Sequence, residues 1–198
     1  MGLRKLKLAI FISGRGSNML SILEACKDPE FPAEIVLVLS NRPDAKGLIS
    51  AANADIPTEM VDHKNYDSRE AFENEIQKRL EKYNIDLIVL AGFMRVLTSH
   101  FVEEWSDRVI NIHPSLLPDY KGLNTHERAI NDGKAEAGCS VHYVIPDLDS
   151  GKVILQKHVP ILDGDTPESL ANRVLEQEHI AYPEAIRLIS QNSGKQLD

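Results

Sequence analysis

Four short apolar runs, separated by segments with helical spacing, constrain the fold of this chain more than any other feature. They cover residues 6–12, 35–39, 85–90 and 109–112. Apolar runs of this length are typical of strands that are buried on both faces of a sheet. Strands that alternate with helices in this way predict a parallel sheet with right-handed crossovers.

Helices are expected between these strands, together with a short strand at 58–61. The expected helices cover residues 17–27, 47–54, 69–83 and about 99–105. The helix at 69–83 has the clearest pattern, because Asp67 or Ser68 can cap it and its apolar residues recur every four positions.

The pattern changes after Pro118. A loop leads to a helix expected at 125–131, and then to two strands expected at 139–145 and 153–159. The segment between these strands, Pro146–Gly151, is rich in turn-forming residues and indicates a hairpin.

The last helix is expected from about Glu168 to Ser190, because Pro167 suits a first helical turn that follows capping residues. Pro183 is a potential break in this helix. We therefore expect one α/β domain over residues 1–190, with a mostly parallel sheet and a C-terminal antiparallel hairpin, and a flexible tail over residues 191–198.

Composition limits the class of protein. At 198 residues, with 42% hydrophobic and 26% charged residues, the chain suits one soluble domain with a sizeable core. A net charge of −8 gives no overall positive field to attract nucleic acid or an anionic membrane, although a local basic patch stays open. No apolar run approaches the roughly 20 residues of a membrane span, and residues 8–12 are better explained by a strand than by a signal sequence. We expect a cytoplasmic protein without nucleic-acid or membrane partners.

The segment Asn111–Pro118, with the sequence Asn-Ile-His-Pro-Ser-Leu-Leu-Pro, is the first candidate site. On an extended strand the side chains of Asn111 and His113 point the same way, and Pro114 keeps a helix from starting there. Asp149, in the later turn Asp-Ser-Gly, adds a carboxylate. An amide, an imidazole and a carboxylate suit the stabilisation of an oxyanion and the movement of a proton in acyl transfer. A strand end with a buried, hydrogen-bonded histidine is equally compatible with this spacing.

The second candidate site is the glycine loop Gly14-Arg15-Gly16-Ser17-Asn18, between the first strand and the first helix. Glycines let the backbone approach an anion, and the N–H groups of a helix N-terminus favour it. Met19 stands where the dinucleotide-binding fingerprint has its third glycine, and the Gly-Lys-Ser/Thr of a P-loop is missing. A monophosphate is therefore the better candidate, and a tight turn without a ligand is the alternative. Arg15 either adds charge there or points into solvent.

These motifs, with others along the chain, resemble the folate-dependent formyltransferases nearly from end to end. The matching segments are Ser13–Asn18, Ala91–Arg95, Asn111–Pro118, Gly122–His126, Ser140–His142, Asp149–Gly151, Ile154–Gln156, Gln177–His179 and Tyr182–Pro183. As a set they are most similar to the members that act on glycinamide ribonucleotide. The resemblance implies a three-layer, Rossmann-like formyltransferase fold over residues 1–190.

The resemblance also implies an enzyme that transfers the formyl group of 10-formyltetrahydrofolate, its co-substrate, to the amine of glycinamide ribonucleotide in purine biosynthesis. The amine attacks the formyl carbon directly, through an oxyanion intermediate. Protonated His113 and the Asn111 amide are expected to donate hydrogen bonds to that oxyanion. Asp149 is expected to favour the imidazolium and to help relay the amine proton. Asp147 is chemically equal, but the family has its aspartate directly before the Ser/Gly-Gly turn.

Binding residues follow from the same resemblance. The nucleotide and its phosphate are expected at Gly14, Arg15, Gly16, Ser17, Asn18 and Glu178. The folate is expected at Arg69, Met94, Arg95, Val96, Leu97, Asn111, Ile145, Pro146, Asp147, Leu148 and Asp149. Without the resemblance, the apolar residues among these would be assigned to the core, and Arg69 and Glu178 to exposed helix faces.

Two positions depart from the family pattern. Lys121 stands where the family usually has proline, so the loop around it is expected to be more mobile or to make altered contacts. Ser150 replaces the commoner glycine after Asp149, which changes the backbone conformations open to the hairpin. Neither change removes a catalytic atom.

Other candidate residues are given no catalytic role. Cys26 and Cys139 form no Cys-x-x-Cys pair, and we expect both to be packing residues. The spacing of the histidines matches no metal motif, so no metal is predicted. His126 and His142 lie in family-like segments and are expected to support the centre or the fold rather than to carry protons.

Several alternatives stay open. A formyltetrahydrofolate deformylase would send water to the same carbon, but it would ordinarily carry an N-terminal regulatory domain. A transfer RNA formyltransferase would carry a C-terminal barrel, and we expect neither extra domain. The non-enzyme alternative is a folate- or nucleotide-binding module, against which the intact Asn111, His113 and Asp149 argue. Small-molecule substrates and a monomer or homodimer are expected.

Overall fold

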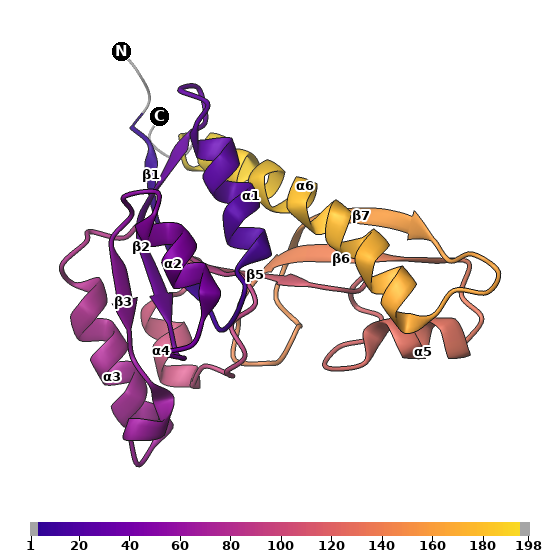
Figure 1. Cartoon of the computed structure of the whole chain (residues 1–198), viewed down its shortest axis with the longest axis horizontal. Coiled ribbons are helices and arrows are strands. Elements are labelled where there is room, and N and C mark those ends of the chain that lie inside the picture. Colours follow the sequence, from indigo (N-terminus) through magenta and orange to yellow (C-terminus); the bar gives the residue numbers. More distant parts are fainter. Residues whose placement is uncertain (1–3, 195–198) are drawn as a thin grey trace.

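Seven strands form one sheet in the computed structural model, which describes residues 4–194 (Figure 1). Their bounds are β1 Leu6–Ile12, β2 Ala33–Ser40, β3 Thr58–Met60, β4 Leu87–Leu90, β5 Val109–His113, β6 Glu136–Tyr143 and β7 Val153–Pro160. The strands lie in the order β3-β2-β1-β4-β5-β6-β7. Neighbours from β3 to β5 are parallel, whereas β6 runs antiparallel to β5 and β7 runs antiparallel to β6. The predicted mostly parallel sheet with a C-terminal antiparallel hairpin is confirmed.

Helices cover both faces of this sheet, which gives three layers (Figure 1). Their bounds are α1 Ser17–Cys26, α2 Lys46–Ala52, α3 Arg69–Leu80, α4 Ser99–Glu104, α5 Thr125–Asn131 and α6 Pro167–Gly194, with a short 3-10 turn at His63–Asn65. Strand β1 shows why there are two helical layers. Leu8 and Ile10 pack with residues of α1 and α6 on one face, while Ala9 and Phe11 pack with α3 and α4 on the other. Successive strand residues point to opposite faces of the sheet, so each face carries its own helical layer. The predicted three-layer fold is confirmed.

The prediction of a strand at residues 139–145 is wrong at both ends. Strand β6 begins at Glu136, because β7 extends to Pro160 and pairs with it there. It ends at Tyr143, because its other neighbour, β5, begins at Val109 and pairs Ile110 with Tyr143. Pairing between strands therefore sets these boundaries, rather than the apolar content of the segment itself.

The last helix is longer than predicted. Its N-terminus is capped by Thr166, whose Oγ1 accepts the N–H of Ser169 at 3.1 Å, and the helix continues through Pro183 to Gly194. Proline removes one helical hydrogen bond, but Tyr182 and Ala185 beside it are fully buried and hold the helix on the sheet. Residues 191–194, predicted to be part of a tail, belong to this helix. The rest of the predicted tail lies outside the described residues.

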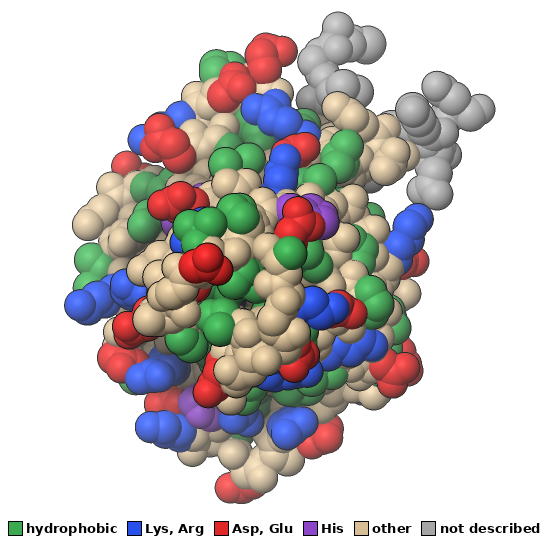
Figure 2. Space-filling view, turned by 90° about the vertical axis from the view of Figure 1, so that its right-hand side faces the viewer, with side chains coloured by type: hydrophobic (Ala, Val, Ile, Leu, Met, Phe, Trp, Pro, Cys, Tyr) green, Lys and Arg blue, Asp and Glu red, His purple; other side chains and the backbone are tan. Residues whose placement is uncertain are grey.

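The surface carries charges of both signs. Figure 2 shows Lys and Arg side chains interspersed with Asp and Glu over one face, with hydrophobic side chains between them. Within residues 4–194, the structure contains no helix that has both the length and the apolar character needed to cross a bilayer.

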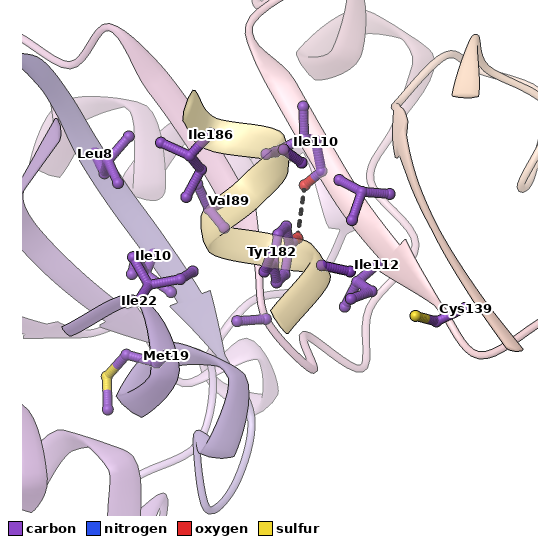
Figure 3. Close-up of a cluster of buried hydrophobic side chains, with 14 of the residues drawn as sticks. Leu8, Ile10, Met19, Ile22, Val89, Ile110, Ile112, Cys139, Tyr182 and Ile186 are labelled. Atoms are coloured by element: carbon purple, nitrogen blue, oxygen red, sulfur yellow. Dashed lines mark hydrogen bonds between the residues drawn. The ribbon is translucent and has the colours of Figure 1, made fainter. Parts of the chain in front are cut away.

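Tyr182 joins α6 to the middle of the sheet. Its side chain is fully buried, and its hydroxyl donates to the backbone carbonyl oxygen of Leu90 at 2.7 Å. The carbonyl oxygen of Ile110, on the next strand, lies 3.4 Å from the same hydroxyl (Figure 3). A buried hydroxyl needs such a partner, because burial removes its hydrogen bonds to water.

We expect Tyr182→Phe to lower the free energy of unfolding by about 1–3 kcal/mol, the range for buried polar groups that lose a partner. Urea-induced unfolding followed by circular dichroism measures this loss. Tyr66→Phe is a matched control, because Tyr66 lies in the segment between β3 and α3 and its ring is half-buried beside Phe72. Equal losses in the two variants would contradict the role given to the Tyr182 hydroxyl.

Candidate active site

A hollow of about 330 Å³ lies outside the carboxyl ends of β1 and β4. The strand order reverses between these neighbours, since the chain continues from β1 to β2 on one side and later enters β4 on the other. Open α/β sheets bind ligands at such a point. The residues that line the hollow are Ser13, Gly14, Arg15, Gly16, Ser17, Asn18, Arg42, Ala91, Gly92 and Met94. They include the whole predicted glycine loop.

The glycine loop leads directly into the N-terminus of α1. Gly16 has a φ of +73°, a left-handed conformation that favours glycine. No side chain caps the helix, so N–H groups of its first turn are free to face an anion, which the helix dipole also favours. Arg15 is exposed at the rim of the hollow.

Asn18 connects this hollow to α6. Its Nδ2 donates to Oε2 of Glu178 at 2.7 Å, while its Oδ1 is buried and has no hydrogen-bond partner within residues 4–194. Glu178 is 8% exposed, so the structure excludes a solvated helix face for it. Burial raises the pKa of Glu178, and the hydrogen bond from Asn18 acts in the opposite direction. A buried carboxyl beside an unpaired amide oxygen suits a ligand that donates hydrogen bonds, such as a hydroxyl.

A larger cavity of about 410 Å³ shares Met94 with this hollow. Its walls come mainly from the segment after β4 and from the turn between β6 and β7. The lining residues are Leu90, Phe93, Met94, Arg95, Val96, Leu97, Val102, Asn111, Leu123, His142, Val144, Ile145, Pro146, Asp147, Leu148 and Asp149. Apolar walls with a few convergent polar groups are typical of small-molecule sites.

Every residue predicted for the folate site lines this cavity, except Arg69. Arg69 lies exposed at the start of α3, and its assignment stays a prediction. Met94 and Val96 are 73% and 55% exposed, which excludes the core positions that their residue types alone would indicate. The sequence interpretation missed the lining residues Leu90, Phe93, Val102, Leu123 and Val144, and it gave His142 only a supporting role. Apolar residues near strand ends carry no signal that separates a cavity wall from the core.

Three polar side chains meet at the wall of the cavity: Asn111, His142 and Asp149. Asn111 on β5 pairs directly with His142 on β6, so their side chains share a face. Asn111 Nδ2 lies 3.4 Å from His142 Nε2, which in turn lies 3.7 Å from Asp149 Oδ1. His142 Nδ1 donates to the Tyr143 carbonyl at 2.9 Å, which leaves Nε2 as the acceptor for Asn111. Burial lowers the pKa of His142, against the effects of the Tyr143 carbonyl and the Asp149 charge.

His113 lies against Asp149 and is not one of the residues that line the cavity. Its Nδ1 is 3.4 Å from Asp149 Oδ2, and both side chains are 7% exposed. Its Nε2 lies 2.9 Å from the carbonyl oxygen of Tyr120. Because a carbonyl can only accept, Nε2 carries a proton, and Nδ1 is the nitrogen that faces Asp149. The predicted imidazole, carboxamide and carboxylate therefore lie in one cluster, in which His142 joins Asn111 to Asp149.

The turn that carries Asp149 has a demanding backbone. Asp149 itself has a φ of +47°, and its Oδ2 accepts the N–H of Gly122 at 2.9 Å. At Gly151, a Cβ atom would lie 1.8 Å from the carbonyl oxygen of Tyr143. Only glycine fits there, so Gly151 allows the hairpin to close tightly beside Asp149.

Neither cysteine takes part in this cluster. Cys139 is fully buried, and burial raises the pKa of its thiol to about 12. Burial likewise raises the pKa of the half-buried Cys26 thiol to about 11. Both thiols are free and pack inside, as predicted. In the part of the chain that the structure describes, no group of His, Cys, Asp and Glu side chains is arranged to hold a metal ion.

His126 lies close to this cluster. Burial lowers its pKa, and the neighbouring His113 lowers it further. Its Nδ1 is buried and has no hydrogen-bond partner among the described residues. It does not line the large cavity, and its supporting role stays a prediction.

Comparison with known proteins identifies the class to which this fold and site belong. A profile of the family described as formyl transferase matches residues 6–186. The chain belongs to this family. Over 178 residues it is 44% identical to the phosphoribosylglycinamide formyltransferase of Escherichia coli (strain K12). This alignment covers 90% of this chain and 84% of the relative. A solved structure of the phosphoribosylglycinamide formyltransferase from Coxiella burnetii is 49% identical, with a TM-score of 0.90 over 96% of this chain and 89% of that one.

Longer relatives match as well. The chain is 45% identical over 186 residues to the trifunctional purine biosynthetic protein adenosine-3 of Gallus gallus. That match covers 94% of this chain but 18% of the relative, so the chain spans under a fifth of the length of that protein.

The raised pKa of Glu178 leads to a stability prediction. The Glu178 carboxyl binds a proton more tightly in the folded than in the unfolded protein. The protonated form therefore stabilises the fold at pH values below the unfolded-state pKa, and this stabilisation is lost as the pH rises through the folded-state pKa. We therefore expect Glu178→Gln to unfold at a higher urea concentration than the wild type at pH 7, with a smaller difference near pH 4. Glu176→Gln, an exposed position on the same helix, is the control. A lower midpoint for Glu178→Gln at pH 7 would reject this account.

Proposed function

We propose that this protein transfers the formyl group of 10-formyltetrahydrofolate to the amine of glycinamide ribonucleotide, a step of purine biosynthesis. The observation that carries this proposal is the polar cluster of Asn111, His113 and Asp149, of which Asn111 and Asp149 line the apolar cavity. That cavity shares Met94 with the anion-binding hollow. A phosphorylated acceptor fits the hollow, and an aromatic donor fits the cavity.

The acceptor is placed by its phosphate and its ribose. The phosphate binds at the N–H groups of Gly14–Asn18, where the uncapped N-terminus of α1 favours an anion. The ribose hydroxyls donate to Glu178 and to Oδ1 of Asn18, and the second contact gives this buried oxygen the partner that it lacks within residues 4–194.

The co-substrate is placed by apolar walls. Its pterin ring lies between the segment Met94–Leu97 and the turn Ile145–Asp149, and backbone groups of that turn contact its polar edge. This binding mode brings the formyl group toward Asn111 and Asp149, which line the same cavity.

In the proposed reaction, the amine nitrogen attacks the formyl carbon and negative charge develops on the formyl oxygen. The Asn111 amide and protonated His113 donate hydrogen bonds to that oxygen. His113 acts through Nδ1, because its Nε2 is committed to the Tyr120 carbonyl. Asp149 balances the charge of the protonated ring and takes up the amine proton, directly or through water. The bond from the formyl carbon to the folate nitrogen then breaks, and that nitrogen receives a proton.

Deformylation is the second candidate, with water in place of the amine. The anion-binding hollow favours the amine acceptor, because water needs no phosphate site. We also infer that the chain acts on small molecules, as a monomer or homodimer in the cytoplasm. Its net charge of −8 supports the absence of a nucleic-acid partner.

A turnover assay with 10-formyltetrahydrofolate tests this proposal, with glycinamide ribonucleotide and water compared as acceptors. We expect transfer to the ribonucleotide to be much faster than hydrolysis. His113→Ala and Asp149→Asn are each expected to lower kcat by about 100- to 1,000-fold, since each removes a group that acts on the reacting atoms.

Asp163→Asn is the matched control, because Asp163 is exposed in the loop between β7 and α6 and should keep the wild-type rate. Circular dichroism confirms that each variant is folded. Full activity in either His113→Ala or Asp149→Asn would refute the catalytic assignment, and faster hydrolysis than transfer would favour a deformylase.

The glycine loop is tested separately by calorimetry. We expect Gly16→Ala to weaken glycinamide ribonucleotide binding by about tenfold, because a side chain in the left-handed conformation costs about 1–2 kcal/mol. Its Cβ would also lie 3.3 Å from the Cα of Gly47. Gly14→Ala should lose less, because a Cβ there meets nothing within 4 Å. Folate binding should be largely kept in both, and unchanged nucleotide affinity in Gly16→Ala would reject the role of the loop.

A further inference from the structure

Lys121 and Ser150, the two positions at which the sequence analysis expects a departure from the family pattern, touch each other. Lys121 Nζ donates to Ser150 Oγ at 2.7 Å, and Ser150 Oγ donates onward to the carbonyl oxygen of Leu148 at 2.8 Å. A hydroxyl has one proton to donate and lone pairs to accept, so both hydrogen bonds form together. The contact therefore joins the loop at residues 119–124 to the turn that carries Asp149.

This loop touches both members of the buried His113–Asp149 pair. On one side of Lys121, the carbonyl oxygen of Tyr120 accepts from His113 Nε2 at 2.9 Å. On the other side, the N–H of Gly122 donates to Asp149 Oδ2 at 2.9 Å. A displacement of Lys121 therefore moves both contacts.

The loop has few ties to the turn. Within residues 4–194, two hydrogen bonds join residues 119–124 to residues 146–151: the Gly122–Asp149 bond and the Lys121–Ser150 bond. The contacts of Arg128 hold the loop to α5 instead, since its Nη1 donates to the carbonyl of Lys121 at 2.8 Å. Its guanidinium also lies 5.1 Å from the centre of the Tyr120 ring. Without Lys121, the Asp149 carboxylate alone would hold the loop at the turn.

We propose that Lys121 and Ser150 form a positioning contact that holds loop 119–124 against the turn and so keeps His113 and Asp149 aligned. Both side chains lie outside the cavity wall and touch no reacting atom, so they act through the pair rather than as catalytic residues. The inference rests on the proposed function, because the proposed reaction is what makes this alignment matter.

Kinetics of single and double variants test the contact. We expect Lys121→Met and Ser150→Ala each to lower kcat by about two- to five-fold, the range for an exposed charged contact. The KM for glycinamide ribonucleotide should change little, because the hollow that holds it involves neither residue. The double variant should be no slower than either single one, because the two residues share one interaction. Ser150→Thr keeps the hydroxyl and should keep the wild-type rate. Lys27→Met, which removes an exposed lysine directly after α1, is the control.

Hydrogen exchange followed by mass spectrometry gives a readout that needs no activity. Amides of residues 119–124 should exchange faster in Lys121→Met and Ser150→Ala than in the wild type, while amides of β1 exchange at the same rate. Faster exchange with a lower kcat supports the proposal. Unchanged exchange, additive losses in the double variant, or faster exchange with an unchanged kcat would overturn it. If the wild type transfers no formyl group, the proposed function fails, and exchange alone decides whether the contact holds the loop.

Discussion

The pairing of β5 with β6 is the interaction on which the polar cluster depends. Its register places Asn111 opposite His142 and His113 opposite Ser140. Side chains that face each other across antiparallel strands share a face, so a slip of one residue would turn Asn111 and His113 away from their partners. The fully buried hydroxyl of Ser140 helps to fix the register, since it accepts the N–H of Leu117 at 3.0 Å.

Several titratable side chains of the site are buried, where they do little for stability. The His113 and Asp149 side chains are each 7% exposed, and Glu178 is 8% exposed. Removing ionised groups from water costs free energy that a buried pair recovers only in part, so a buried ion pair is weak support for stability. Buried groups of this kind are typical of functional sites, which supports the roles that we propose for them.

The fold was predictable from sequence because its signals are local. Apolar runs located the parallel strands, and α5 lies at the predicted residues 125–131. The segments 94–97 and 145–149 line the cavity because short contiguous motifs build its walls. The contacts around His113 were not predictable, because its Nε2 meets the backbone carbonyl of Tyr120, and backbone groups leave no trace in a residue pattern. The contact between Lys121 and Ser150 likewise depends on how two loops fold against each other.

The hollow at the glycine loop and the large cavity share one lining residue. Met94 lines both the hollow at the glycine loop and the large cavity. Its backbone N–H donates to Ser13 Oγ at 2.7 Å, and Ser13 Oγ donates to Asn41 Oδ1 at 2.5 Å. Ser13 directly follows β1 and leads into the glycine loop, so the segment that lines the hollow also holds a wall of the cavity. In the proposed reaction, a shared wall of this kind fixes the distance between the two substrates, which direct transfer between them requires.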